Sequence, residues 1–179
     1  KLSDRIKLLR ENGIHSIKSK FKNLPYYPNY YEQVDSGFNF RMSEISAALV
    51  NSQLKKLNFF VNKRNQIAKT YLKLIKNPKF IFQDNNKDAK SSYHLFVVKL
   101  TNQNSNQYLK IFKIFNKNKI FINLHYKALH LNPFFEEMGF KKGQFPISEN
   151  YSYTAFSIPI FVGLEEKNIK KIISILNNF

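Results

Sequence analysis

The residues best suited to bind a ligand lie in a short polar segment just ahead of a long apolar pattern. Asn39 and Arg41 are followed by Ser43 and Glu44. The latter two are typical of a helix N-terminus, because serine caps free backbone N–H groups and glutamate suits the positive end of the helix dipole. An amide and a guanidinium beside a helix N-terminus indicate an anion site. The signal is weak on its own, since an asparagine before a helix more often serves as a cap or turn residue.

The histidines and acidic residues indicate no further catalytic or metal site. His125 and His130 are five residues apart, but no third ligand with metal-binding spacing accompanies them, so we expect no zinc site. Glu136 and Glu137 are adjacent, and adjacent residues on a helix point in different directions, which favours a solvated face over a catalytic pair. The 5 glycines form no phosphate-binding loop. We therefore assign no catalytic residue within these 179 residues.

The composition indicates a folded, cysteine-free and strongly basic protein. The lack of cysteine excludes disulfides, thiolate catalysis and cysteine-based metal sites, and it fits a reducing compartment, so we expect a cytoplasmic protein. The net charge of +17 would ordinarily favour a nucleic-acid partner. The excess, however, is nearly all lysine, spread along the chain with abundant Asn, Ile, Phe and Tyr, as an AT-rich coding sequence produces. We therefore favour no nucleic-acid partner, and no long apolar run predicts a membrane span.

Helical and strand patterns alternate along the chain. It opens inside an amphipathic segment, residues 1–11, without a methionine, so we expect an N-terminal part to be missing. Between residues 42 and 76 there is no glycine or proline, and apolar residues recur at helical spacing, which predicts one long helix. Beyond it we predict strands at 80–82, 93–100, 120–126 and 155–158, and helices at 106–117, 133–138, 145–154 and from 164 onward. This order predicts an α+β unit with a small sheet covered on one side.

Several motifs then occur in a definite order. Residues 32–49 read EQVDSGFNFRMSEISAAL, and they are followed by YHLFV at 93–97, NLHYKALHLNP at 123–133 and AFSIPIF at 155–161. With these motifs the chain closely resembles the DegT/StrS family of pyridoxal-phosphate-dependent nucleotide-sugar aminotransferases. The resemblance covers essentially the whole chain. Within the family the chain is most similar to the aminotransferases of pseudaminic acid biosynthesis.

The resemblance implies a fold and a domain organisation. The chain would be the C-terminal portion of a fold-type I PLP-dependent transferase, with a long connecting helix and a small domain in which helices flank a short antiparallel sheet. Residues 1–41 would complete the large cofactor-binding domain and its active-site loop. Residues 42–76 would form the connecting helix, and residues 77–179 the small domain.

The resemblance also implies roles for individual residues. The asparagine of the family's Gly-x-Asn-[Tyr/Phe]-Arg motif reaches the neighbouring subunit's active site near the cofactor phosphate, and Asn39 occupies that position. The family segment that contacts the sugar nucleotide corresponds to Asn123, Leu124, His125 and Tyr126. His125 would bind a sugar hydroxyl or a phosphate, and the alternative is a loop histidine that bonds only to water.

The chemistry itself would depend on residues upstream of Lys1. The family's Schiff-base lysine, its phosphate-binding serine and the aspartate that pairs with the pyridinium nitrogen have no counterpart in this chain, so we expect it to be inactive alone. The whole enzyme would be a homodimer that transfers an amino group, from glutamate, to C4 of a UDP-linked 4-keto-6-deoxy-N-acetylhexosamine. Two alternatives stay open: a catalytically inactive relic that serves dimerisation or interaction, and a basic nucleic-acid-binding module.

Overall fold

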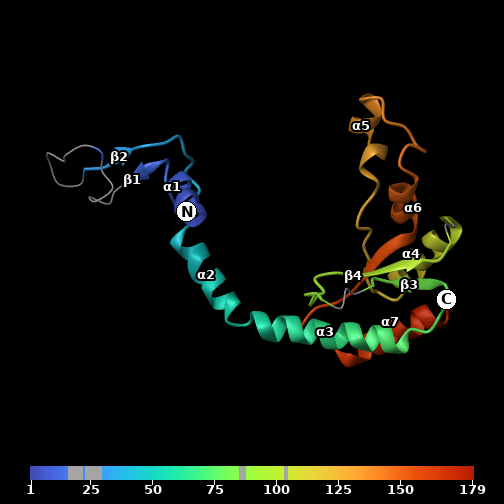
Figure 1. The fold of residues 1–179 in the computed structure, drawn as a ribbon. Coiled ribbons are helices and arrows are strands. Elements are labelled where there is room, and N and C mark those ends of the chain that lie inside the picture. Colours follow the sequence, from blue (N-terminus) through green and yellow to red (C-terminus); the bar gives the residue numbers. More distant parts are fainter. Residues whose placement is uncertain (16–21, 23–29, 85–87, 103–104) are drawn as a thin grey trace. The chain divides into compact units, whose positions relative to one another are not determined.

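The computed structural model describes residues 1–15, 22, 30–84, 88–102 and 105–179 (Figure 1). The contacts within the chain divide it into two compact units, Lys1–Lys55 and Lys56–Phe179. In the part of the chain that the structure describes, no helix is both long enough and apolar enough to span a membrane.

The first unit consists of short elements around a close crossing of the backbone. Its elements are α1 (Leu2–Arg10), β1 (Ile14–His15), β2 (Glu32–Gln33) and α2 (Glu44–Leu54), and β1 pairs antiparallel with β2. A Cβ on Gly37 would lie 2.3 Å from the nitrogen of Gly13, and a Cβ on Gly13 would lie 1.9 Å from the carbonyl oxygen of Asp35. Only glycine fits at both positions, and the crossing sets the course of the chain toward residues 38–41.

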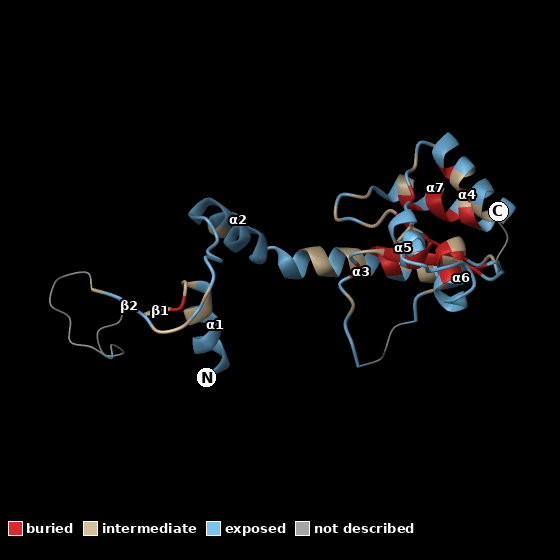
Figure 2. Ribbon diagram, turned by 90° about the horizontal axis from the view of Figure 1, so that it is seen from above, coloured by how far each residue is buried: buried red, intermediate tan, exposed pale blue. Residues whose placement is uncertain are grey.

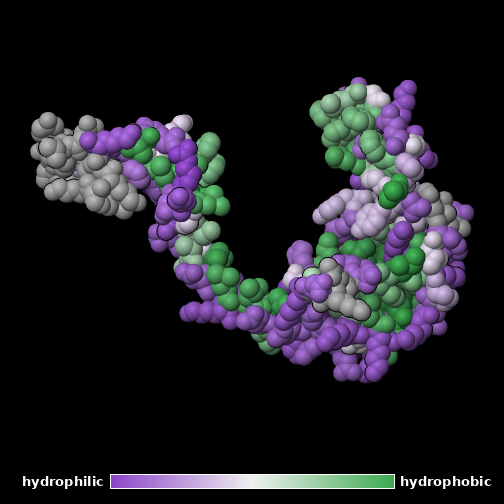
Figure 3. Space-filling view, in the orientation of Figure 1, coloured by the Kyte–Doolittle hydropathy of each residue, from purple (hydrophilic) through white to green (hydrophobic). Residues whose placement is uncertain are grey.

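The helices of the first unit bury none of their apolar side chains completely. No residue of α1 or α2 is buried. Figure 3 shows hydrophobic side chains along α2, and its large exposed ones are Ile45, Leu49, Val50 and Leu54. Apolar faces of this kind usually pack against further protein.

The helix expected between residues 42 and 76 is present but divided. α2 ends at Leu54, α3 spans Leu57–Leu74, and Lys55 and Lys56 form a turn between them. Both lysines have backbone angles in the right-handed helical region. The backbone conformation therefore changes little where the helical hydrogen bonds are interrupted. The division coincides with the boundary between the two units. Sequence pattern could not place it, because lysine is a good helix former.

The second unit confirms the expected α+β class. After α3 come β3 (Phe80–Phe82), β4 (Phe96–Leu100), α4 (Ser105–Lys117), the 3-10 helix η2 (Leu129–Leu131), α5 (Pro133–Glu137), α6 (Pro146–Thr154), β5 (Ala155–Ile158) and α7 (Glu166–Asn177). The strands form one antiparallel sheet in the order β3-β4-β5, with Phe80 opposite Leu100 and Phe96 opposite Ile158. The helices predicted at 106–117, 133–138 and 145–154 are confirmed with small differences at their ends, and the last predicted helix begins at Glu166 rather than at residue 164.

The core of the second unit lies between the helices and the sheet, where Figure 2 shows the buried residues. Two tyrosines anchor β5 within it. The hydroxyl of Tyr71 on α3 donates to the carbonyl oxygen of Pro159 at 2.8 Å, and that of Tyr108 on α4 donates to Ala155 at 2.9 Å. Burial raises the pKa of both phenols, that of Tyr108 to about 12. Both ends of β5 are therefore fixed by hydrogen bonds from neighbouring helices.

Two predicted strands differ from the structure. The strand expected at 93–100 begins only at Phe96, because Tyr93 has a positive φ of 44° and cannot continue a strand. Arg64 and Asn65 of α3 bind the preceding backbone, at the carbonyl oxygens of Ser92 and Ser91, 2.7 and 2.9 Å away. The prediction of a strand at 120–126 was wrong. This segment forms a single β-bridge to β5, between Asn123 and Ser157, before the chain turns toward η2.

Candidate functional site

Asn39 lies in an extended segment that is hydrogen-bonded to the end of α1. The N–H groups of Phe38 and Phe40 donate to carbonyl oxygens at the end of that helix, at 2.7 and 3.1 Å. Asn39 itself forms an isolated antiparallel bridge with Glu11. The exposed rings of Phe38 and Phe40 stack with their centroids 4.9 Å apart. Because side chains alternate along an extended chain, the exposed side chain of Asn39 projects on the opposite side.

Arg41 orients the side-chain amide of Asn39. Its Nε donates to Oδ1 of Asn39 at 2.8 Å, and its Nη1 lies 3.6 Å from Oε2 of Glu11. The amide oxygen is therefore occupied, whereas Nδ2 has no partner among the described residues and is available as a donor. An amide donor beside an exposed guanidinium is a suitable donor set for a phosphate group, because both supply N–H groups and the guanidinium also supplies charge. These residues thus fit the phosphate of the expected cofactor.

The helix N-terminus next to this segment has the predicted cap. Oγ of Ser43 accepts a hydrogen bond from the N–H of Ser46 at 3.2 Å, and Glu44 lies in the first turn of α2. The cap occupies one of the free N–H groups that the helix dipole would otherwise present to an anion. The side chains of Asn39 and Arg41 add further donors just ahead of α2.

The segment predicted to contact the sugar nucleotide, residues 123–126, is hydrogen-bonded to β5 in the second unit. The N–H of Ser157 donates to the carbonyl oxygen of Asn123 at 2.8 Å, and the N–H of Asn123 donates back to Ser157 at 3.2 Å. Nδ1 of His125 lies 2.8 Å from Oγ of the same serine. The ring of Tyr126 meets the imidazole edge-to-face, with the ring centroids 4.9 Å apart. The structure thus brings Asn123, His125 and Tyr126 together beside one edge of the sheet.

The accessibility of these four residues differs. Asn123 and Tyr126 are exposed, the latter with 73% of its surface, whereas Leu124 and His125 are half-buried. Nε2 of His125 has no hydrogen-bond partner in the part of the chain that the structure describes. The segment therefore presents an amide, an imidazole nitrogen and a phenol, which are groups that bind sugar hydroxyls and phosphate oxygens.

Sequence reasoning missed a buried histidine–glutamate pair close to this segment. Nε2 of His130 and Oε1 of Glu149 are 2.8 Å apart, and both side chains are 8% exposed. The same carboxylate oxygen accepts the N–H of Gly143 at 2.7 Å and that of Phe145 at 3.4 Å. The hydrogen bond from His130, reinforced by these N–H groups, lowers the pKa of Glu149. The pair links η2 to the start of α6 and closes the loop between them.

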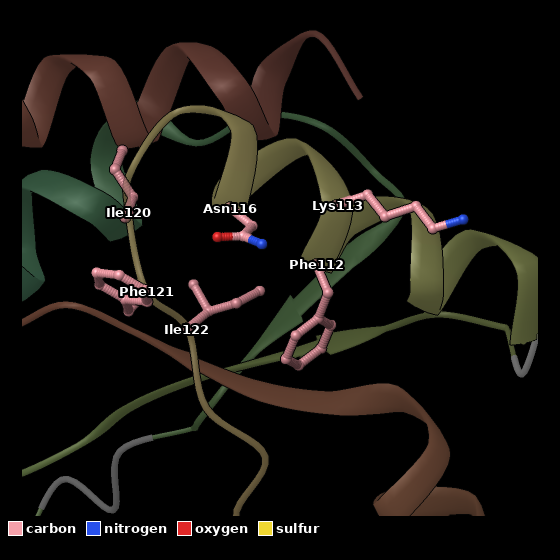
Figure 4. A pocket seen from close by; sticks show the side chains of 6 residues that line it. All are labelled: Phe112, Lys113, Asn116, Ile120, Phe121 and Ile122. Carbon is pink, nitrogen blue, oxygen red and sulfur yellow. The ribbon is translucent and has the colours of Figure 1, made fainter.

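Two surface pockets of the second unit lie elsewhere. One of about 340 Å³ is lined by Phe112, Lys113, Asn116, Ile120, Phe121 and Ile122 (Figure 4). Another, of about 360 Å³, lies over the sheet and includes Lys99 and Tyr151. Neither is lined by a predicted site residue, although Ile122 directly precedes Asn123. Among the described residues, no group of three or more His, Asp or Glu side chains could hold a metal ion.

Comparisons with known proteins identify relatives of the whole chain. A UDP-4-amino-4,6-dideoxy-N-acetyl-beta-L-altrosamine transaminase from Campylobacter jejuni is 32% identical over 94% of this chain and 42% of its own length. The solved structure of Helicobacter pylori PseC, an aminotransferase involved in the biosynthesis of pseudoaminic acid, is 26% identical, with a TM-score of 0.78 over 99% of this chain and 45% of that one. The putative sugar aminotransferase Spr1654 from Streptococcus pneumoniae, in its PLP-form, shares the fold, with 18% identity and a TM-score of 0.79 over 99% and 43% of the two chains.

A match to a family description places the chain in a family. The chain spans less than half the length of each, so it corresponds to a part of such proteins. The family description that matches residues 1–177 is the DegT/DnrJ/EryC1/StrS aminotransferase family. This match covers the cap of α2, the Asn39 segment and the segment from Asn123 to Tyr126 alike. The chain therefore belongs to the DegT/DnrJ/EryC1/StrS aminotransferase family.

Proposed function

We propose that the protein containing this chain is a PLP-dependent sugar aminotransferase. It transfers an amino group from glutamate to C4 of a UDP-linked 4-keto-6-deoxy-N-acetylhexosamine, in the biosynthesis of pseudaminic acid or a related surface sugar. The observation that carries the proposal is the 32% identity to the Campylobacter jejuni transaminase over 94% of this chain. The likeness to PseC over 99% of the chain supports the same substrate class.

The residues of this chain would bind and orient rather than react. When bound, pyridoxal phosphate supplies the electron sink that amino transfer needs. Asn39, with its amide oriented by Arg41, donates to the phosphate of the cofactor in a partner subunit of a homodimer. The exposed guanidinium of Arg41 adds positive charge beside that phosphate.

The second group of residues would hold the sugar nucleotide. Asn123 and Tyr126 offer an exposed amide and an exposed phenol, and His125 offers the free Nε2 of its imidazole. Leu124, which is half-buried, would complete the contact with the sugar nucleotide. The lysine that carries the cofactor lies outside these 179 residues in this proposal, so the isolated chain has no activity.

An amino-transfer assay on the whole protein tests the proposal. The protein is incubated with pyridoxal phosphate, glutamate and the UDP-linked 4-keto sugar, and both products are followed by mass spectrometry. We expect the UDP-4-amino sugar and 2-oxoglutarate in equal amounts, and no product from the 179-residue chain alone. A whole protein that retains pyridoxal phosphate but forms neither product with any 4-keto sugar nucleotide would contradict it and favour the inactive-relic alternative.

A further inference from the structure

Ser157 makes the hydrogen bonds that connect the candidate substrate segment, residues 123–126, to β5. It is 7% exposed and lies at the third position of β5, opposite Val97 of β4 on one side and Asn123 on the other. Its backbone makes both hydrogen bonds of the bridge to Asn123, at 2.8 and 3.2 Å. Its side chain reaches the imidazole of His125, two residues further along. Backbone and side chain of one serine therefore fix two successive parts of the segment.

The hydroxyl of Ser157 has a single hydrogen and two acceptors within reach. Oγ lies 2.8 Å from Nδ1 of His125 and 3.4 Å from the carbonyl oxygen of Asn123. That carbonyl already accepts the N–H of Ser157 at 2.8 Å. A separation of 2.8 Å is close to the optimum for a hydroxyl donor, whereas 3.4 Å is near the outer limit. The hydroxyl hydrogen is therefore better placed on the His125 side.

The direction of this hydrogen bond decides what His125 offers to a ligand. A neutral imidazole carries one proton, so if Nδ1 accepts from the serine hydroxyl, the proton must lie on Nε2. If instead Nδ1 carried the proton and donated to Oγ, Nε2 would be an acceptor. Nε2 is the nitrogen without a partner among the described residues, so it is the one that meets a ligand.

We propose that Ser157 is a positioning residue that holds the neutral His125 in the tautomer with its proton on Nε2. His125 then donates a hydrogen bond to an oxygen atom of the bound sugar nucleotide, an assignment that rests on the proposed function. The ring of Tyr126 packs edge-to-face against the half-buried imidazole, 4.9 Å away between centroids. The serine thus selects for ligands that present an acceptor at this point.

The tautomer can be measured without any enzymatic activity. The histidines of the whole protein are labelled with nitrogen-15, and the protein is studied by NMR at a pH where His125 is neutral. The signals of His125 are those that disappear in the His125→Gln variant. We expect Nε2 to have the nitrogen-15 chemical shift of a protonated imidazole nitrogen, and Nδ1 to have that of an unprotonated one. In Ser157→Ala we expect this preference to be lost. The matched control is Ser152→Ala, which removes another buried serine hydroxyl in the same unit, bonded to the carbonyl oxygen of Glu149.

Kinetics supply the second measurement. Loss of one oriented hydrogen bond should raise KM for the UDP-sugar about fivefold in Ser157→Ala, with kcat little changed. In a His125→Ala background the same serine substitution should have no further effect, and Ser152→Ala should leave KM unchanged. A proton on Nδ1 in the unsubstituted protein, or a Ser157→Ala variant with unaltered tautomer and KM, would overturn the inference. If the protein transfers no amino group at all, the proposed function fails, and the NMR measurement still decides the role of Ser157.

Discussion

Nε of Arg41 donates to Oδ1 of Asn39 at 2.8 Å, which leaves the amide nitrogen of Asn39 as its free end. An asparagine side chain can rotate to present either its oxygen or its nitrogen. A neighbouring guanidinium removes that choice, because it can only donate. The geometry therefore makes Asn39 a donor toward any group that approaches it, and a phosphate is a group of the matching kind.

The first prediction concerns this orientation. Arg41→Ala should weaken the affinity of the whole protein for pyridoxal phosphate about threefold, because the amide of Asn39 loses its preferred orientation and the phosphate loses a nearby positive charge. The affinity is measured by titrating the apoprotein with the cofactor and following its absorbance.

Arg10→Ala is the matched control for that variant. Arg10 is an exposed arginine of the same unit that also pairs with Glu11, at 2.9 Å, and it makes no hydrogen bond to Asn39. We expect its loss to leave the cofactor affinity unchanged. Equal losses in both variants would show that charge alone, rather than the orientation of Asn39, accounts for the effect.

The second prediction concerns acid stability. The pKa of Glu149 is lowered from its ordinary value of 4.5 by the hydrogen bond from His130 and by two backbone N–H groups. A carboxyl with a lower pKa in the folded state stabilises the fold above its unfolded pKa, and this stabilisation is lost as the pH falls through the folded pKa. We therefore expect the melting temperature to fall as the pH drops below 4.5.

Glu149→Gln tests this dependence directly. Glutamine keeps an acceptor oxygen but not the charge. The variant should therefore have a lower melting temperature at neutral pH, and its melting temperature should decrease less as the pH is lowered. Glu137→Gln, at an exposed position in α5, is the control and should keep the slope of the unsubstituted protein. Thermal unfolding, followed by circular dichroism between neutral pH and about pH 3, gives the melting temperature and its dependence on pH for each variant. If the melting temperatures of the two variants depend on pH in the same way, Glu149 does not have this role.

Features that depend on local residue chemistry could be predicted from the sequence. Ser43 caps its helix as expected, because serine at this position has a local partner three residues later. The positions of β5 and of the helices that follow α3 could be predicted from their apolar periodicity and from their proline and glycine limits. The α+β class followed from the order of these elements.

Features that depend on distant partners could not be predicted. Glu149 is 19 residues from His130, and their pairing requires the loop before α6 to return to η2. The only signal was a histidine within an apolar run and a glutamate in the first turn of a helix, which separately indicate nothing. The prediction of a strand at 120–126 was wrong for a related reason, because the segment meets β5 at one backbone bridge, Asn123 to Ser157, and otherwise through the side chains of His125 and Ser157, which are 32 residues apart. The functional roles of Asn39 and of residues 123–126 stay predictions.

The central claim is that this chain supplies Asn39 to the cofactor site of a partner subunit, and a complementation experiment tests it most directly. Asn39→Ala alone should weaken cofactor affinity about tenfold, since it removes a hydrogen bond to a charged group. We then mix this variant with a variant that lacks the cofactor-binding lysine, exchange their subunits, and measure amino transfer at a cofactor concentration too low to saturate either variant. Random exchange of equal amounts makes about half of the dimers mixed. If Asn39 acts across the dimer, each mixed dimer contains one complete site of its two, so activity should recover toward about a quarter of that of the unsubstituted protein. If the mixture is no more active than its unmixed components although mixed dimers form, Asn39 does not serve a partner's site, and the claim is contradicted.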